Sequence, residues 1–319
     1  MPDPCVRPGR DSDAAGFIAL IGACWAEYPD VIFDIDGEVP ELRALATHYA
    51  GKGGMLWAAE AKGGEVVGMV ATLPAKAEAD AASCWEIARM YVARPWRGTG
   101  LAHRLLDRAE SHARAQGARR AVLWSDTRFR PAHRFYEKRS YVRVGPLRVL
   151  NDLSRTLEFG FTKPLAGVVA QPLGAAATAS AARSLATIPP AAAPDEPVSQ
   201  ANSAAHWRRV AAEIAAGSRI LVAAWNEGVI AGSVEIALPP PETGPAFLER
   251  LIVPSGSGDS DVGRALLMAA AAAARDAGRS VLAAMIRDGG RSADLLRGNG
   301  WESGAPSPFG LWWRALART

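Results

Sequence analysis

The stretch Val92-Ala-Arg-Pro-Trp-Arg97-Gly98-Thr99-Gly100-Leu101-Ala102 decides how this chain is interpreted. It joins an apolar strand, Met90-Tyr91-Val92, to an amphipathic helix expected to run to Gly117. The first turn of a helix has unpaired backbone N–H groups and a partial positive charge, so it attracts anions. Glycine lets the backbone approach a phosphate closely, and Arg97 adds positive charge. The stretch is therefore predicted to cradle a pyrophosphate.

Two other glycine-rich nucleotide motifs do not fit this stretch. A P-loop requires Lys-Ser/Thr after its second glycine, and none follows Gly100. A dinucleotide fingerprint requires a third glycine, but Gly98-Thr-Gly100 is followed by Leu101-Ala102-His103. Taken in isolation, the turn is also consistent with an ordinary loop that caps a helix.

The flanking segments make the interpretation more specific. Glu86-Ile-Ala-Arg-Met-Tyr-Val92 precedes the turn, and Ala132-His-Arg-Phe-Tyr136-Glu-Lys-Arg-Ser-Tyr141 follows it. Together they resemble the GNAT superfamily of acyl-CoA-dependent N-acyltransferases, whose Gln/Arg-x-x-Gly-x-Gly/Ala motif matches Arg97 to Ala102. The resemblance covers roughly residues 3–163. Two departures lie on the acceptor side: Ser140 replaces a usual glycine, and Phe129 replaces a frequent asparagine.

The resemblance implies an acetyl-CoA site and a pair of catalytic residues. Glu86 occupies the position of the family's general base, and Tyr136 that of its frequent tyrosine acid. A backbone N–H near Tyr91 or Val92 would hold the thioester oxygen, where the strand separates from its neighbour. His133 is a rival base one turn before Tyr136. The implied cofactor-binding residues are Met90, Tyr91, Val92, Arg97, Gly98, Thr99, Gly100, Leu101 and Ala102.

Glu86 has a physical reason to act as a base. An amine with a lysine-like pKa of about 10.4 is protonated at neutral pH and must lose a proton before it attacks a thioester. A positioned carboxylate takes that proton directly or through a water. The neighbours Trp85 and Ile87 are apolar, so we expect them to shield the carboxylate from water.

The acceptor is expected to contact the segment between Cys24 and Glu38, which is both acidic and aromatic. This composition favours a cationic acceptor, although helix capping by Asp36 ahead of Pro40 would explain part of the acidity. Arg128 could bind an acidic acceptor or a CoA phosphate, or pair with Asp126. The candidate acceptor-binding residues are Trp25, Tyr28, Asp34 and Arg128.

The composition limits the broad class of the protein. The chain has 319 residues, 49% of them hydrophobic and 22% charged, and a net charge of +3. This charge gives no sign of nucleic-acid binding. Three cysteines provide neither a disulfide framework nor metal-ligand spacing, and no signal peptide or membrane span is expected. We therefore expect a cytoplasmic protein without a metal, either a monomer or a homodimer.

The chain also repeats itself. Val92 aligns with Val253, Ala102 with Gly263 and Gly117 with Gly278; the differences 253−92, 263−102 and 278−117 are each 161. A repeat of this length is a duplicated domain. We predict an α/β (α+β) protein with two tandem GNAT-like domains, residues 1–165 and 166–319, each a twisted mixed sheet flanked by helices.

The second copy is predicted to be degenerate. Gly258-Asp-Ser-Asp261-Val-Gly263 aligns with the turn, so Arg97 becomes Gly258 and Gly100 becomes Asp261. Asp259 and Asp261 would repel a pyrophosphate by roughly 1 kcal/mol each in water at about 4 Å. Phe247 replaces Glu86, and Leu296 replaces Tyr136. This copy is interpreted as structural, with acceptor binding as the alternative.

These patterns predict an acetyl-CoA-dependent N-acetyltransferase whose acceptor is a small cationic amine. Two alternatives stay open. A non-catalytic acyl-CoA sensor would need Arg97 to Ala102 but neither Glu86 nor Tyr136. A protein-lysine acetyltransferase would need an open acceptor groove.

Overall fold

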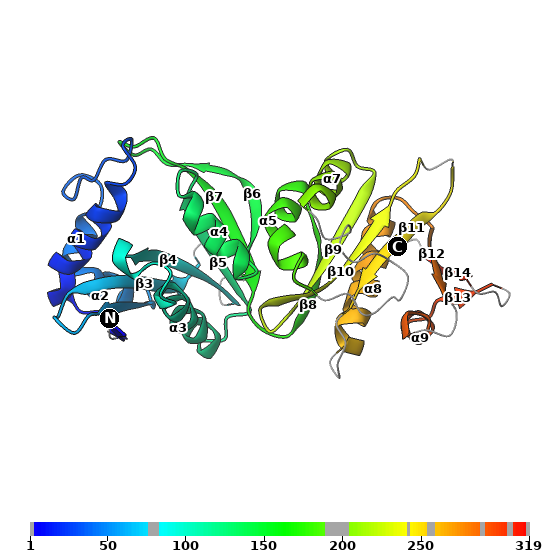
Figure 1. The fold of residues 1–319 in the computed structure, drawn as a ribbon, viewed down its shortest axis with the longest axis horizontal. Helices are drawn as coiled ribbons and strands as arrows, with labels where there is room; N and C mark the ends of the chain where they lie inside the picture. The colour runs from blue at the N-terminus through cyan, green and yellow to red at the C-terminus, as the bar shows by residue number, and fades with distance from the viewer. Residues whose placement is uncertain are drawn as a thin grey trace. The chain divides into compact units, whose positions relative to one another are not determined.

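The computed structural model describes residues 3–75, 83–188, 204–240, 243–253, 259–287, 291–304 and 309–316. The chain divides into two compact units. Unit 1 comprises Met1–His133 and Val144–Ala166; unit 2 comprises Arg134–Arg143 and Gly167–Thr319. The sequence assigns Arg134–Arg143 to the first domain, whereas its contacts group it with unit 2. Each unit is described separately below (Figure 1).

Unit 1 is built on a seven-stranded mixed sheet with the order β1-β2-β3-β4-β5-β7-β6. Strand β4 pairs in parallel with β5 and antiparallel with β3. The central β3 is buried along nearly its whole length, as expected for a strand covered on both faces. The strands are β1 (Cys5–Pro8), β2 (Met55–Glu60), β3 (Val66–Pro74), β4 (Cys84–Val92), β5 (Arg120–Asp126), β6 (Val142–Val149) and β7 (Leu157–Pro164).

Helices cover both faces of this sheet. Helix α1 packs on one face through Phe17 and Ile21. Helix α3 covers the other, where the rings of Trp57 and Trp85 lie against His112. Gly117, with φ +86°, stands just past the end of α3 in the left-handed conformation that ends many helices. The helical segments of unit 1 are η1 (Asp11–Asp13), α1 (Ala14–Trp25), η2 (Pro40–Ala44), α2 (Leu45–Ala50), η4 (Arg94–Trp96) and α3 (Leu101–Ala115). Helix α4 (Arg130–Lys138) begins in unit 1 and continues into the Arg134–Arg143 segment of unit 2.

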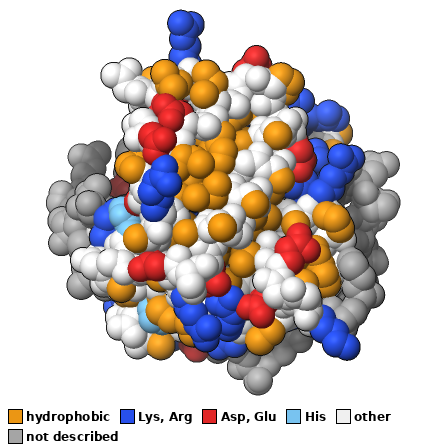
Figure 2. Space-filling view, turned by 90° about the vertical axis from the view of Figure 1, so that its left-hand side faces the viewer, with side chains coloured by type: hydrophobic (Ala, Val, Ile, Leu, Met, Phe, Trp, Pro, Cys, Tyr) orange, Lys and Arg blue, Asp and Glu red, His pale blue; other side chains and the backbone are white. Residues whose placement is uncertain are grey.

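Helix α1 has no charged residue, and neither has the Ala26 that follows it. Its outward residues Ala15, Ala19 and Ala23 are exposed. Figure 2 looks at the molecule from the left of Figure 1, the end that carries α1, and shows hydrophobic side chains gathered over the middle of this face, with charged side chains among and around them. Packing of α1 on the sheet, rather than surface charge, therefore holds this helix in place.

A buried ion pair fastens α3 to the sheet. Lys163 Nζ on β7 donates to Glu110 Oε1 at 2.8 Å and to Oε2 at 3.0 Å, and both residues are almost fully buried. A buried charge is costly unless it is paired; Glu110 is paired with Lys163 and has a longer contact with Arg114 Nη2, at 3.5 Å.

Unit 2 has a sheet with the order β13-β14-β12-β11-β10-β9-β8. Its strands are β8 (Val168–Leu173), β9 (Arg219–Asn226), β10 (Val229–Ala237), β11 (Ala246–Ile252), β12 (Val281–Arg287), β13 (Glu302–Ser303) and β14 (Phe309–Ala315). Its helices are α5 (Ala175–Leu185), α7 (Ala204–Ala215), α8 (Asp259–Asp276) and α9 (Arg291–Gly298). The Ala/Pro-rich segment 189–197 lies outside the described residues.

The two sheets share one topology. Read from β8, the order in unit 2 repeats that of unit 1, and β11 pairs in parallel with β12 as β4 does with β5. Glu86 lies opposite Val122 in unit 1, and Phe247 lies opposite Ala283 in unit 2; 247−86 and 283−122 both give 161. The predicted fold, two domains with mixed sheets flanked by helices, is confirmed.

One glycine in each unit marks the same close approach of helix to sheet. A Cβ at Gly68 would lie 2.9 Å from Leu105 Cδ1 and 3.3 Å from Leu101 Cδ2 on α3. A Cβ at Gly232 would lie 2.9 Å from Leu266 Cδ1 and 3.1 Å from Val262 Cγ1 on α8. Leu266 and Val262 lie 161 residues after Leu105 and Leu101 (266−105 and 262−101). The two units therefore share this packing contact as well as their strand order.

Candidate functional site

The parallel ladder between β4 and β5 stops before either strand ends. It pairs Cys84–Ile87 with Arg120–Leu123, whereas β4 continues to Val92 and β5 to Asp126. On its other side β4 is irregular, because its pairing with β3 shifts register between Met69 and Ala71. The backbone of β4 beyond Ile87 thus has no ladder partner on β5. The sequence predicted such a separation near Tyr91 and Val92.

Arg89 lies at this irregularity in a left-handed conformation, with φ +50°. Such a conformation is strained for a residue with a side chain and is often found near functional sites. Its Nη2 donates to Glu41 Oε1 at 2.5 Å. The neighbouring Tyr49 is buried, and this burial raises the pKa of Tyr49 to about 12. Neither Arg89 nor Glu41 was singled out from the sequence, since no motif marks them.

The predicted cradle forms a turn that opens helix α3. Gly98 and Gly100 have φ +80° and +90°, and Gly100 is the residue that caps α3. No side chain caps the helix there, and no atom lies within 4 Å of where a Cβ would stand on either glycine. Thr99 Oγ1 donates to Trp96 O at 2.8 Å, which closes the turn. The start of α3 thus has the backbone geometry and open space that an anion requires.

The side chain of Arg97 is hydrogen-bonded to groups outside the predicted cradle. Its Nη1 and Nη2 donate to Glu27 Oε2 and Oε1 at 2.8 and 2.7 Å, and its Nε donates to Val92 O at 3.0 Å. The hydrogen bonds from Arg97 lower the pKa of Glu27, which follows α1 in the chain. Glu27 lies in the acidic segment predicted to contact the acceptor, but its pairing with Arg97 was not predicted.

Glu86 lies on β4 and is half-buried. The expectation that Trp85 and Ile87 shield it is wrong in its geometry. Side chains alternate along a strand, so both neighbours point to the opposite face, where Trp85 meets His112 of α3. Glu86 instead acts electrostatically on Tyr49 of α2. It thus faces the side of the sheet that carries α1, α2 and the loop between them.

Tyr136 is buried near the end of α4, next to the rings of Phe135 and Tyr141. It belongs to the Arg134–Arg143 segment of unit 2. His133, the rival base, is packed in unit 1: its Nε2 lies 2.9 Å from Asp126 O, and its ring contacts Phe159 and Phe161. These contacts hold the His133 ring against β5 and β7.

The predicted acceptor-binding residues fall into two groups. Trp25 Nε1 donates to Tyr91 Oη at 3.0 Å, and the ring of Tyr28 lies 4.7 Å from that of Phe129, so both aromatics line the face that Glu86 shares. Asp34 instead accepts the backbone N–H groups of Asp36 and Gly37 and shapes the loop.

Arg128 also has structural partners. Its Nε and Nη2 donate to the Asp126 carboxylate, with Nη2–Oδ2 at 2.5 Å, which is the ion pair that the sequence left open. Its Nη1 donates to Asp30 O at 2.9 Å, and its Nη2 donates to Thr156 Oγ1 at 3.0 Å. Arg128 thereby joins the end of β5 to two loops.

Two loops close over this side of unit 1. The α1–α2 loop contributes Ile32, whose N–H donates to Ser154 Oγ at 2.8 Å, and Glu38, whose Oε1 accepts the N–H of Leu153 at 2.5 Å. Ser154 and Leu153 lie in the β6–β7 loop. The expected capping role of Asp36 is wrong: Val39 caps η2, and Asp36 pairs with Arg43.

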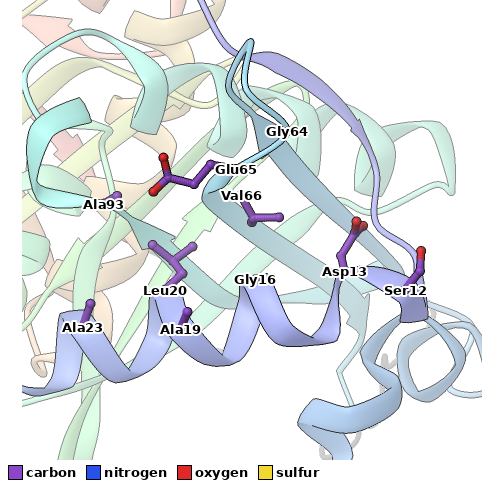
Figure 3. A pocket seen from close by; sticks show the side chains of 10 residues that line it. All are labelled: Ser12, Asp13, Gly16, Ala19, Leu20, Ala23, Gly64, Glu65, Val66 and Ala93. Carbon is purple, nitrogen blue, oxygen red and sulfur yellow. The ribbon is translucent and has the colours of Figure 1, made fainter.

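A cavity of about 450 Å³ lies beside the N-terminal half of α1. Figure 3 shows Gly16, Ala19 and Ala23 of α1 along one wall and Glu65 of the β2–β3 turn opposite. None of the predicted site residues lines it. The cavity therefore does not coincide with the turn, or with the α1–α2 side of β4, where the predicted site residues lie.

In unit 2, only part of the aligned turn is described. Gly258 lies outside the described residues. Asp261 is exposed on α8 and pairs with Arg264 at 2.7 Å. Within the described ranges, no group of three or more His, Cys, Asp or Glu side chains is placed to hold a metal ion. The described helices also include none with the length and hydropathy of a membrane span.

Comparison with known proteins identifies the first unit. Residues 22–141 match the model of the acetyltransferase (GNAT) family. The chain contains a GNAT acetyltransferase domain. Over these residues the chain is similar to the acetyltransferases of that family. No curated protein matches the chain.

Solved structures of similar proteins cover about half of the chain. An acetyltransferase from Streptococcus agalactiae is 19% identical, covers 52% of this chain and 100% of its own, and has a TM-score of 0.44. A GNAT-family acetyltransferase from Staphylococcus aureus is 17% identical, with coverages of 50% and 96% and a TM-score of 0.42. A Salmonella typhimurium structure solved with its cofactor acetyl-CoA is 18% identical, with coverages of 50% and 92% and a TM-score of 0.40.

Proposed function

We propose that unit 1 transfers an acetyl group from acetyl-CoA to the primary amine of a small cationic acceptor. The turn carries this proposal. Gly98 and Gly100 open helix α3 in left-handed conformations, directly after a strand whose ladder with β5 has ended. The space beside both glycines is open, so the residues present fit a pyrophosphate held by backbone N–H groups.

The cofactor would be held by two neighbouring segments. The turn residues Arg97, Gly98, Thr99, Gly100, Leu101 and Ala102 would hold the pyrophosphate. Met90, Tyr91 and Val92 would lie at the thioester end, where a backbone N–H of Tyr91 or Val92 is the proposed oxyanion donor. When bound, acetyl-CoA supplies the activated acetyl group.

Glu86 and Tyr136 are the proposed proton-transfer residues. The Glu86 carboxylate would take a proton from the acceptor amine, directly or through a water, and it lies on the same side of the sheet as the α1–α2 loop. The Tyr136 hydroxyl is the proposed proton donor for the leaving thiolate. The assignment of Tyr136 rests on the resemblance of its segment to the family.

The small acceptor is favoured by the closed loops. Hydrogen bonds from Ile32 to Ser154 and from Leu153 to Glu38 join the α1–α2 loop to the β6–β7 loop on the side that Glu86 faces. A lysine on a folded protein would need these loops apart. Carboxylates of the α1–α2 loop, among them Asp30 and Asp34, favour a cation.

We further propose that the second domain, residues 166–319, is a degenerate copy without catalysis. Phe247 stands at the register position of Glu86, and a phenyl ring has no group that accepts a proton. Asp261 stands at the position of Gly100 and adds negative charge where a pyrophosphate would bind. Together with the scarcity of cysteines, the proposed reaction suits a cytoplasmic protein.

The test is release of the CoA thiol from acetyl-CoA over a panel of small amines and lysine peptides, with acetyl-CoA binding measured by calorimetry. We expect turnover with small cationic amines and none with peptides. Tight acetyl-CoA binding without turnover on any amine would identify a sensor. Turnover confined to peptides would identify a protein-lysine acetyltransferase.

A further inference from the structure

The guanidinium of Arg97 is committed to the end of helix α1. Its two terminal nitrogens donate to both oxygens of Glu27 at 2.7 and 2.8 Å. Its Nε donates to Val92 O at 3.0 Å, and Nη2 lies 3.6 Å from Cys24 Sγ. A two-point contact between arginine and a carboxylate fixes orientation as well as charge, which lysine cannot reproduce.

This contact lies where the chain leaves α1 and enters the α1–α2 loop, residues 26–39. We call this loop the acceptor loop, because it carries candidate acceptor-binding residues. Glu27 stands two residues past Trp25, the last residue of the helix, at the root of the α1–α2 loop. The C-terminal end of a helix carries partial negative charge, which adds to the attraction for Arg97. From Ala14 to Ala26 the chain has no charged residue, so Glu27 is the first carboxylate after η1 that can meet the turn.

The C-terminal end of α1 contacts β4 at two further points. Trp25 Nε1 donates to Tyr91 Oη at 3.0 Å, and Cys24 Sγ lies 3.7 Å from Val92 O. The far part of the loop is held by Ser154 through Ile32. The acceptor loop is thus anchored at one end on the last residues of β4 and on the cofactor turn.

We propose that Arg97 is a positioning residue, whose side chain fastens the acceptor loop to the cofactor turn through Glu27, while the backbone N–H groups of the turn hold the phosphates. This inference rests on the proposed function, because it assigns the turn to the cofactor and the loop to the acceptor. It follows that losing the pair disturbs the acceptor before it disturbs acetyl-CoA.

The opposite assignment makes predictions of opposite sign. If the guanidinium were a phosphate ligand, the Glu27 carboxylate would compete with the phosphates for it. Removing the carboxylate would then tighten acetyl-CoA binding, and removing the arginine would weaken it and flatten its salt dependence.

The experiment compares Glu27→Gln, Arg97→Ala, Arg97→Lys and the Glu27→Gln/Arg97→Ala double variant. We expect the KM for the acceptor to rise about two- to five-fold in each, the range of a partly exposed ion pair, with kcat and the acetyl-CoA Kd within about twofold. The double variant should be no worse than Arg97→Ala, because both changes remove one contact. Arg94→Ala, which removes an exposed charge from η4 just before the turn and leaves the contact between Arg97 and Glu27 in place, is the matched control and should change these values less than any of the four variants.

Hydrogen exchange of residues 26–39 gives a reading that does not depend on turnover. We expect faster exchange there in Glu27→Gln, Arg97→Ala and Arg97→Lys, but not in Arg94→Ala. A tenfold weaker acetyl-CoA affinity in Arg97→Ala, tighter binding in Glu27→Gln, or unchanged exchange would overturn the proposal. A wild-type protein that acetylates no amine would refute the proposed function alone, since the exchange and affinity results would still decide the role of Arg97.

Discussion

Strand β4 of unit 1 and strand β11 of unit 2 hold the same place in their sheets, yet Glu86 of the first corresponds to Phe247 of the second. The packing positions around them agree: Gly68 faces Leu105 and Gly232 faces Leu266, at the same helix–sheet contact. The comparison separates two demands on one fold. Close packing of helix on sheet is needed in both units, whereas a carboxylate at this register position is present only in the unit where we propose chemistry.

The charged interiors of the units also differ. Unit 1 buries the Lys163–Glu110 pair beneath α3. At the corresponding positions unit 2 has Ala271, which is buried, and Arg314, which pairs opposite Leu282 as Lys163 does opposite Ala121 and donates to Asn299 O. The same topology is therefore held with and without an ion pair at these two positions.

The largest effect is expected from removing the proposed base of unit 1. Glu86→Gln should lower kcat/KM by about 10²- to 10⁴-fold, because the amide cannot take the proton of the amine. The acetyl-CoA Kd should stay within about twofold, as measured by calorimetry. Phe247→Leu at the matching position of unit 2 is the control and should leave kcat/KM unchanged. Retained turnover in Glu86→Gln would remove the chemical distinction between the units.

The next largest effect is expected on stability, from breaking the buried ion pair between Lys163 and Glu110 in unit 1. Lys163→Met leaves the buried Glu110 with the longer contact to Arg114 Nη2, at 3.5 Å, which should lower the free energy of unfolding by up to about 3–5 kcal/mol in urea titrations. The Glu110→Ala/Lys163→Met double variant, which copies the alanine of unit 2, should lose less than this single variant. A double variant that is less stable than Lys163→Met would show that the pair is worth more than apolar packing.

Copying the turn of unit 2 into unit 1 should weaken the binding of acetyl-CoA. Gly100→Asp adds a carboxylate beside the expected pyrophosphate, and Gly100→Asn adds the same bulk at the left-handed φ of +90° without the charge. The affinity for acetyl-CoA should be about fivefold or more lower in Gly100→Asp than in Gly100→Asn, since like charges about 4 Å apart repel by roughly 1 kcal/mol in water. Equal affinities would mean that charge does not explain the loss in unit 2.

The smallest effect is expected from the ion pair near the start of unit 1. Hydrogen bonds from Arg7 lower the pKa of Asp13. The contribution of this ion pair to the free energy of unfolding is thus complete above the pKa of Asp13 in the unfolded chain, about 3.9. It is lost as the pH falls through the lower pKa that Asp13 has in the folded protein. Asp13→Asn should destabilise the protein by less than about 1 kcal/mol at pH 7, and by less still at pH 2.

Unit 2 offers no equivalent of this pair, because its first strand β8 contains no charged residue. Asp36→Asn, at an exposed pair with Arg43, is the control. A loss in Asp13→Asn that is the same at both pH values would contradict the assigned linkage.

Much of the fold could be predicted from the chain alone. The alternating and buried apolar runs predict strands, and the constant offset of 161 residues predicts a second domain. The turn at Gly98 and Gly100 is also a local property, because only glycine takes a positive φ without strain. Short-range backbone preferences and periodicity are sufficient for each of these features.

The structure decided which side chains face one another. Strand alternation separated Glu86 from Trp85, contacts placed Tyr136 with unit 2, and the pairing of Arg97 with Glu27 joined residues 70 positions apart. Arg89 likewise pairs with Glu41, which lies 48 positions earlier in the chain. Sequence determined where strands, helices and the turn would form, because these depend on neighbouring residues. The partners of each charge depend on how distant segments pack, which only the tertiary structure fixes.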